Sequence, residues 1–331
     1  MLVSLSTTNP PIAAADSHSE SVAANQDSQS VGDTVERAIP YLERHGEAWI
    51  EKRQCVSCHQ IPFMLWSLSA ADEHGYAIDR SRLKKWRAWS IDIRSFVKPA
   101  QKDDLEIAST LAANIDTLNA LLLGIPAKTE ADTTGEVNPA PWRQNFVNAL
   151  LENQVENGSW KPCGQLPAQK RPLQETIQVT TAWTMLALGR SHATTQRAQQ
   201  ALELLKNESP VSTEWWAVRF LLANQRGDAD AETYSDGLLE KQQPDGGWGW
   251  LTAESSDALA TGMAVYALSR RNGEKSQRAI SKAVTFLTTS QAANGSWKVP
   301  GTKKTTRQEP TPTSNYWGTA WAVIGLLESE Q

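Results

Sequence analysis

Apolar residues along the chain fall in short runs at helical spacing, and polar corners separate the runs. The runs at 146–151 and 284–287 each precede a Gly-containing corner, and those at 181–188 and 319–326 each follow one. Residues three and four positions apart share one helix face, so these runs predict amphipathic or buried helices. The alternation typical of strands is nearly absent. The pattern therefore predicts an all-α protein.

Three of the corners have one composition: Gln, then Asn or Asp followed by Gly, then Trp. They run from Gln154 to Trp160, from Gln242 to Trp248 and from Gln291 to Trp297. An Asn-Gly or Asp-Gly pair supplies the left-handed backbone that stops a helix. The Gln amide can bond freed backbone groups, and the Trp can cover the helix end. The repeating unit is helix, corner, helix, and such units bury their apolar faces against one another in an array.

This pattern resembles the Gln–Trp motif of the squalene-cyclase and protein-prenyltransferase superfamily, clearly over about 140–331 and more faintly before it. The resemblance implies an α/α toroid, with about six inner and about six outer helices. Small residues in the run 258–267, among them Gly262, would let inner helices approach closely. We expect Trp160, Trp248 and Trp297 at equivalent corners.

The chain divides by composition into four parts. Residues 1–32 form a polar tail, 33–125 an N-terminal helical part, 126–141 a Pro-containing connection and 142–331 the repeats. The tail lacks Lys and Arg, yet small residues at 13–15 look like a cleavage site. We expect either the remnant of an export signal, and hence a periplasmic or secreted protein, or a plain disordered tail.

Two helix starts are predicted from capping residues. Asp33 is expected to cap a helix that runs to Lys52, with Pro40 near its start. Asp103 and Asp104 are expected to cap a helix that runs to Leu123.

The amino-acid composition limits the classes of molecule that the protein is expected to bind. The chain of 331 residues has 14 Trp against 5 Phe, which suits Trp used as a repeated corner residue. The net charge of −5 and the lack of a long basic run argue against nucleic acid as a partner. No run approaches about 18 uninterrupted apolar residues, so we expect no membrane-spanning segment.

The sequence Cys55-Val-Ser-Cys58-His59 has the spacing of a c-type haem attachment site. Two thiols at this spacing reach the two vinyl groups of one porphyrin, and His59 would give the iron its proximal imidazole. The motif lies between the first two predicted helices, where later repeats have Gly and Trp. We therefore expect it on the same rim as the long corner segments that follow Trp160 and Trp297.

Other interpretations of this motif stay open. Cys55 and Cys58 could form a disulfide or a redox dithiol. With His59 and Cys163 they could form a metal site, or they could be plain surface residues. The sixth iron ligand is not evident from the sequence; the side chains considered for it are Met185, Met263, His45 and His74, whereas Met64 is too near His59 to reach the opposite haem face.

The cyclase acid motif of the resembling family is incomplete here. That family protonates an alkene with Asp-x-Asp-Asp-Thr at the start of an inner helix, and the matching residues are Asp257 to Thr261. Leu259 and Ala260 replace the central carboxylates and cannot donate a proton. Asp257 is then most simply a helix cap. The prenyltransferase branch uses Asp, Cys and His to bind zinc, and Cys163 and His192 do not fit its motifs.

The sequence is compatible with three functions. The first is an exported toroid with haem c on its rim, in electron transfer or redox chemistry with a redox partner protein. The second is a haem-free, non-catalytic toroid that binds an apolar small molecule or a protein partner. The third is a terpenoid cyclase-like or prenyltransferase-like enzyme whose acids the sequence does not reveal.

Overall fold

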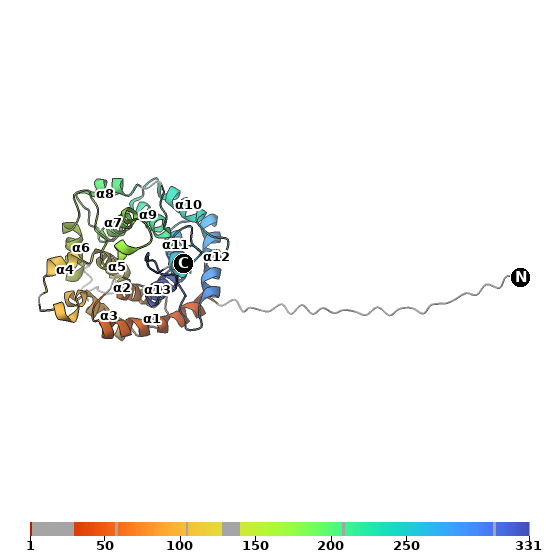
Figure 1. Ribbon diagram of the computed structural model, residues 1–331, viewed down its shortest axis with the longest axis horizontal. Helices are drawn as coiled ribbons and strands as arrows, with labels where there is room; N and C mark the ends of the chain where they lie inside the picture. Colours follow the sequence, from red (N-terminus) through yellow and green to blue (C-terminus); the bar gives the residue numbers. More distant parts are fainter. Residues whose placement is uncertain are drawn as a thin grey trace.

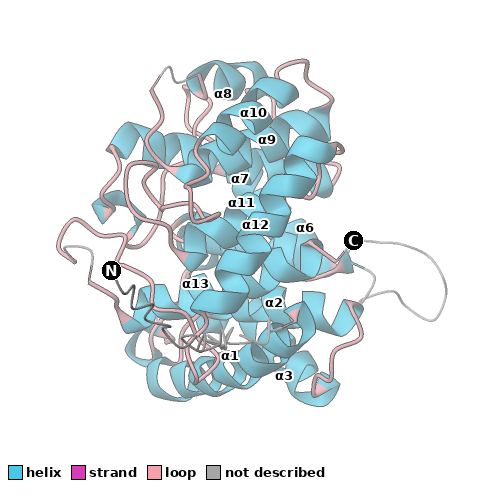
Figure 2. Ribbon diagram, turned by 90° about the vertical axis from the view of Figure 1, so that its right-hand side faces the viewer, coloured by secondary structure: helices cyan, strands magenta, loops and turns pink. Residues whose placement is uncertain are grey.

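The computed structural model describes residues 1, 30–56, 59–103, 105–127, 140–206, 209–306 and 309–330. Regular structure in these residues is helical apart from isolated β-bridges, which confirms the predicted all-α class (Figure 2). The α-helices are α1 (Val31–Arg53), α2 (Ile61–Glu73), α3 (Arg80–Ile91), α4 (Ile107–Ala112), α5 (Ile115–Gly124), α6 (Pro141–Glu152), α7 (Leu173–Arg190), α8 (Ala198–Leu204), α9 (Thr213–Arg226), α10 (Ala231–Glu240), α11 (Ala258–Leu268), α12 (Glu274–Ser290) and α13 (Pro312–Glu328).

The helices form two concentric rings (Figure 1). In the inner ring α2, α5, α7, α9, α11 and α13 each pack on the next, and α13 packs back on α2. The outer layer contains α1, α3, α4, α6, α8, α10 and α12. The predicted α/α toroid is thus confirmed. Helices from both 33–125 and 142–331 build the one inner ring, while the predicted connection 126–141 and tail 1–32 lie largely outside the described residues.

Burial explains which helices are inside. Every residue of α11 is buried, whereas α12 buries only one stripe. A helix that is apolar all round must be surrounded, and an amphipathic one covers a surface. Helices α11 and α13 approach closely, and a Cβ on Gly262 would lie 2.3 Å from the Trp321 carbonyl oxygen. Small residues therefore allow the close approach that the sequence predicts.

The Gln residues of the three corners make equivalent contacts. Each donates through Nε2 to the carbonyl of its own corner glycine and to a carbonyl at the next outer helix along the ring. The pairs are Gln154 with Gly158 (2.9 Å) and Arg197 (3.5 Å), Gln242 with Gly246 (2.8 Å) and Ala279 (2.8 Å), and Gln291 with Gly295 (3.0 Å) and Thr34 (2.9 Å). The last pair joins the final corner to α1 and so closes the outer ring.

The corner Trp residues are equivalent as well, which confirms that expectation. Each indole N–H donates to a Leu carbonyl in the preceding outer helix, and each backbone N–H donates to a Thr hydroxyl on the following inner helix. The pairs are Trp160 with Leu150 (2.6 Å) and Thr181 (3.2 Å), Trp248 with Leu238 (2.8 Å) and Thr261 (2.9 Å), and Trp297 with Leu287 (2.9 Å) and Thr319 (3.2 Å). Each corner thus joins the helices on its two sides.

Both predicted caps were wrong. Helix α1 begins at Val31 with Ser30 as its N-cap, because the Ser30 hydroxyl accepts from the backbone N–H of Asp33 at 3.0 Å. Pro40 lies inside that helix without ending it. The segment predicted as one helix to Leu123 is two, α4 and α5, and Glu106 caps the first through the backbone N–H groups of residues 108 and 109. Asp104 lies outside the described residues.

Candidate functional site

The segment 54–60 joins α1 to α2 at one rim of the toroid. The Cys55 side chain is half-buried, and its carbonyl accepts from the Trp49 indole N–H at 2.9 Å. Burial raises the pKa of the Cys55 thiol, while the charges of Lys98 and Arg53 oppose that rise. Cys58 lies outside the described residues, so the structure does not describe the relation between the two thiols.

Two long corner segments cover the same rim. Residues 161–172 and 298–311 pair through Lys170 N–H to the Thr302 carbonyl at 2.8 Å and Lys304 N–H to the Ala168 carbonyl at 3.2 Å. Together with His59 they border a cavity of about 170 Å³. The expectation that these segments share a rim with the cysteine motif is therefore confirmed.

His59 lies between this rim cavity and a second cavity in the centre of the inner ring. Its ring centroid is 6.3 Å from that of Trp317, and the two side chains border both cavities. Burial, assisted by the charge of Lys303, lowers the pKa of His59 to about 4. The imidazole is therefore neutral at neutral pH, the form in which its nitrogen can bind a metal ion.

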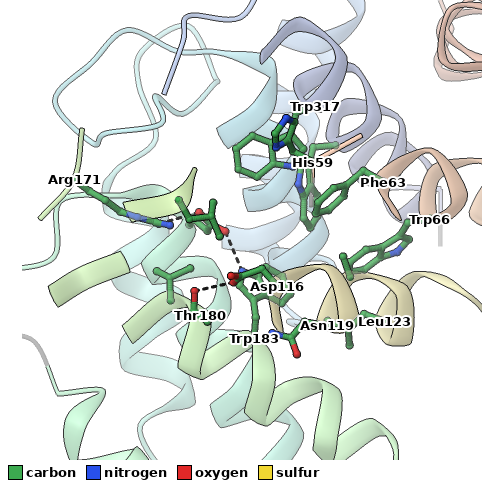
Figure 3. A pocket seen from close by; sticks show the side chains of 15 residues that line it. His59, Phe63, Trp66, Asp116, Asn119, Leu123, Arg171, Thr180, Trp183 and Trp317 are labelled. Atoms are coloured by element: carbon green, nitrogen blue, oxygen red, sulfur yellow. Dashed lines mark hydrogen bonds and ion pairs between the residues drawn. The ribbon is translucent and has the colours of Figure 1, made fainter. Parts of the chain in front are cut away.

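Aromatic side chains line much of the central cavity, which has a volume of about 50 Å³. Figure 3 shows the labelled side chains converging on it from several helices. The aromatic lining residues are Phe63, Trp66, Trp183, Trp317 and Trp321. Since all five come from the inner helices α2, α7 and α13, which are far apart in sequence, only the closed ring brings them together.

Asp116, in the first turn of α5, is the central carboxyl of this cavity. It accepts from the Thr180 hydroxyl at 2.7 Å (Figure 3). It also accepts from the Cys163 backbone N–H at 2.7 Å. Burial raises its pKa, and these hydrogen bonds oppose that rise. The sequence analysis missed Asp116. Its signal was the single charged residue in the largely apolar run 115–124.

A buried ion pair lies on the same wall. Arg171 Nη1 is 2.8 Å from Glu214 Oε2, and the two side chains are only 1% and 8% exposed. The other Glu214 oxygen accepts from the Trp183 indole N–H at 3.0 Å. A buried charge needs such partners, so Arg171 and Glu214 satisfy each other. Both residues were missed from the sequence, since no motif links a corner residue to α9.

Asp257 lies away from the central cavity and is the N-cap of α11. Its carboxylate accepts from the backbone N–H of Ala260 at 2.9 Å and of Trp250 at 2.7 Å. The predicted cap role is confirmed, and Leu259 and Ala260 are fully buried in the core. Burial raises the pKa of Asp257 to about 6 despite these hydrogen bonds.

That raised pKa predicts a pH effect on stability. The folded state binds the Asp257 proton more tightly than the unfolded state, whose pKa is about 3.9. The resulting stabilisation is complete below the unfolded value and is lost as the pH rises through about 6. From about pH 8 to about pH 5 the wild type should gain about 1.4 kcal/mol over Asp257→Asn, as measured by urea unfolding of both proteins. An unchanged difference between the two would contradict this.

The volumes of the cavities and the groove beside the cysteine motif determine where a haem could fit. The two cavities beside His59 are smaller than the roughly 300 Å³ at which cofactor pockets begin. An open groove of about 310 Å³ lies on the outer side of the same segment, between α1 and the start of α13. It is lined by Tyr41, His45, Ala48, Trp49, Lys52, Arg53, Gln60, Pro312, Thr313 and Tyr316. Gln60 is the residue of this segment that lines the groove, whereas His59 borders the two smaller cavities. A haem therefore fits only at the rim, with the His59 imidazole turned toward the groove, and not inside the ring.

The side chains that could provide the sixth ligand differ in burial and in position. Met185 and Met263 are buried in the core, and Met64 is fully buried. His74 lies at the far end of α2 and faces Glu330 at 3.7 Å. His45 lines the groove and packs against Tyr41, with ring centroids 4.3 Å apart and ring planes 41° apart.

Over the described ranges, which omit Cys58, no group of three or more His, Cys, Asp or Glu side chains could hold a metal ion. Cys163 contacts Asp116 instead. No helix among the described residues is long and apolar enough to cross a membrane, in agreement with the sequence.

Comparison with known proteins gives the fold and nothing finer. No family model matches the sequence, and no curated protein matches it. Similar solved structures include a possible member of the GH105 family from Klebsiella pneumoniae, with TM-score 0.56, 14% identity and coverage of 90% of this chain and 92% of that one. An unsaturated glucuronyl hydrolase from Bacillus sp. GL1 has TM-score 0.53, 12% identity and coverage of 91% and 96%.

The type II terpene cyclase MstE from Scytonema has TM-score 0.53, 12% identity and coverage of 90% and 97%. At such identities the likeness shows the fold alone. The chain is therefore an α/α toroid of the kind also found in these hydrolases and terpene cyclases.

Proposed function

We propose that the protein is an exported redox protein that carries a c-type haem at the rim of its toroid. Cys55 and Cys58 would hold the porphyrin through thioether bonds, and His59 would bind the iron. The observation that supports this most is the place of the motif: it replaces a Gly-Trp corner on the rim, next to an open groove and a neutral imidazole.

The groove has the chemistry that a haem edge requires. The Tyr41, Trp49 and Tyr316 side chains give it apolar walls, and Lys52 and Arg53 add positive charge suited to propionate groups. His45 is the imidazole on this side of the segment, and we propose it for the sixth position. Bound haem supplies one-electron chemistry, and the chain's residues hold it and set how far water reaches it.

The test is the mass and spectrum of protein exported together with a haem maturation system. Intact mass should exceed the bare chain by one haem, and the pyridine haemochrome should survive acidic organic extraction, because thioether bonds are covalent. Cytoplasmic expression should give colourless protein. Cys58→Ala should weaken or abolish the attachment. A colourless exported protein whose mass is that of the chain less two hydrogens would instead establish a Cys55–Cys58 disulfide.

Axial ligands are tested separately on the holoprotein. His59→Ala should change the iron spectrum strongly, and His45→Ala should convert a six-coordinate spectrum to a five-coordinate one. Met64→Leu is the matched control, because the fully buried Met64 packs against Gly46 in the core. An unchanged spectrum in His45→Ala would remove His45 from the sixth position while leaving the attachment itself intact.

A further inference from the structure

The central cavity contains a carboxyl whose hydrogen-bond partners in the described part of the chain are all neutral. Asp116 accepts from a hydroxyl and from a backbone N–H, and within the described residues no Lys, Arg or His forms an ion pair with it. Arg171 also lines the cavity, but it pairs with Glu214 at 2.8 Å. A buried carboxylate without a counter-charge is costly, so Asp116 holds its proton more tightly than an exposed carboxyl, and a cation in the cavity would stabilise the charged form.

The rest of the lining is suited to the same charge. The aromatic residues present π-systems, whose faces attract cations. Asn119 is 2% exposed, donates its amide to Thr184 at 2.7 Å, and leaves its Oδ1 buried with no hydrogen-bond partner in the described chain. This unpartnered oxygen belongs to a residue that lines the cavity, and it is an acceptor for an N–H group.

Two donors in the lining point to a further feature of the ligand. The indole N–H groups of Trp317 and Trp321 are buried without acceptors in the described chain. A hydroxyl on the ligand would satisfy one of them. The two indole groups carry no charge, so it is Asp116 that favours a positively charged ligand.

Size restricts the ligand. A buried water requires about 10–15 Å³ of cavity volume. The central cavity of about 50 Å³ therefore holds a molecule of about three to five heavy atoms. Neither a polyprene nor a porphyrin enters it in this arrangement. His59, Leu166 and Trp317 border both this cavity and the rim cavity, so a small molecule would enter from the rim.

We propose that the central cavity binds a small organic ammonium ion, with its charge against Asp116, an N–H on Asn119 Oδ1 and its alkyl groups against the aromatic walls. Binding at this site needs no haem, so this proposal and the proposed haem attachment can be tested and refuted independently.

The test uses a charged and a neutral probe of one shape, tert-butylammonium and tert-butanol, titrated into the full chain by calorimetry and by indole fluorescence. The cation should bind saturably, and the alcohol at least about tenfold more weakly, because the alcohol can donate a neutral hydrogen bond but only the cation gains the charge–charge and cation–π contacts. Equal binding of the two probes, or no binding of the cation at millimolar concentration, would overturn the proposal.

Three variants complete the test. Asp116→Asn removes the charge and should weaken cation binding at least about tenfold without changing the weak binding of the alcohol. Asp257→Asn is the matched control, since it removes another buried carboxylate outside the cavity and should bind like the wild type. Ala120→Leu fills the cavity with Asp116 intact and should abolish binding of both probes. Retained cation affinity in folded Asp116→Asn or Ala120→Leu would overturn the proposed site.

Discussion

Trp297→Ala will lower the free energy of unfolding by about 3–5 kcal/mol. The side chain is 1% exposed, and its indole N–H donates to the Leu287 carbonyl at 2.9 Å. Removing it leaves a large cavity between α12 and α13 and an unpaired carbonyl at the end of α12. The measurement is urea unfolding followed by circular dichroism at a fixed pH.

Two further variants separate packing from hydrogen bonding at this corner. Trp297→Phe keeps most of the apolar volume and loses the N–H, so we expect a clearly smaller loss than for Ala. Trp89→Ala, on the outer helix α3, removes the same side chain from a half-buried position and should cost less still. If Trp297→Ala and Trp89→Ala cost the same, the corner Trp residues are not the structural elements that we infer.

The repeating corners were predictable because their signal is local. Gln, Gly and Trp lie within seven consecutive residues, and each makes its main contact inside the corner or with an adjacent helix. Capping was harder to predict. Ser30, Asp33, Asp103 and Glu106 all have side chains that can accept from backbone N–H groups, and packing decides which of them a helix uses.

The central cavity could not be predicted, because its residues come together only when the ring closes. Asp116 lies on α5 and meets Thr180 on α7, and Glu214 on α9 meets Arg171 in a corner. No spacing in the sequence records these contacts. By contrast, the Cys55 to His59 motif is contiguous, so its chemistry could be proposed from the sequence, although the position of His59 between two cavities could not.

Closure of the outer ring depends on one glycine. Gly295 has φ +84°, and a Cβ there would lie 2.0 Å from the carbonyl oxygen of Arg37 on α1. The same corner holds α1 through Gln291, which donates to the Thr34 carbonyl at 2.9 Å and accepts from Arg37 at 2.6 Å. The last corner of the chain is therefore fitted against its first helix, backbone to backbone.

Gly295→Ala should consequently lower the free energy of unfolding by at least about 3 kcal/mol, from left-handed strain of about 1–2 kcal/mol together with the clash against α1. Gly75→Ala is the matched control, because Gly75 has φ +85° and nothing within 4 Å of the added Cβ. It should show the strain alone. The readouts are urea unfolding and the rate of limited proteolysis in α1, which should rise only in Gly295→Ala. Equal losses in the two variants would mean that contact between the last corner and α1 contributes nothing to the stability of the ring.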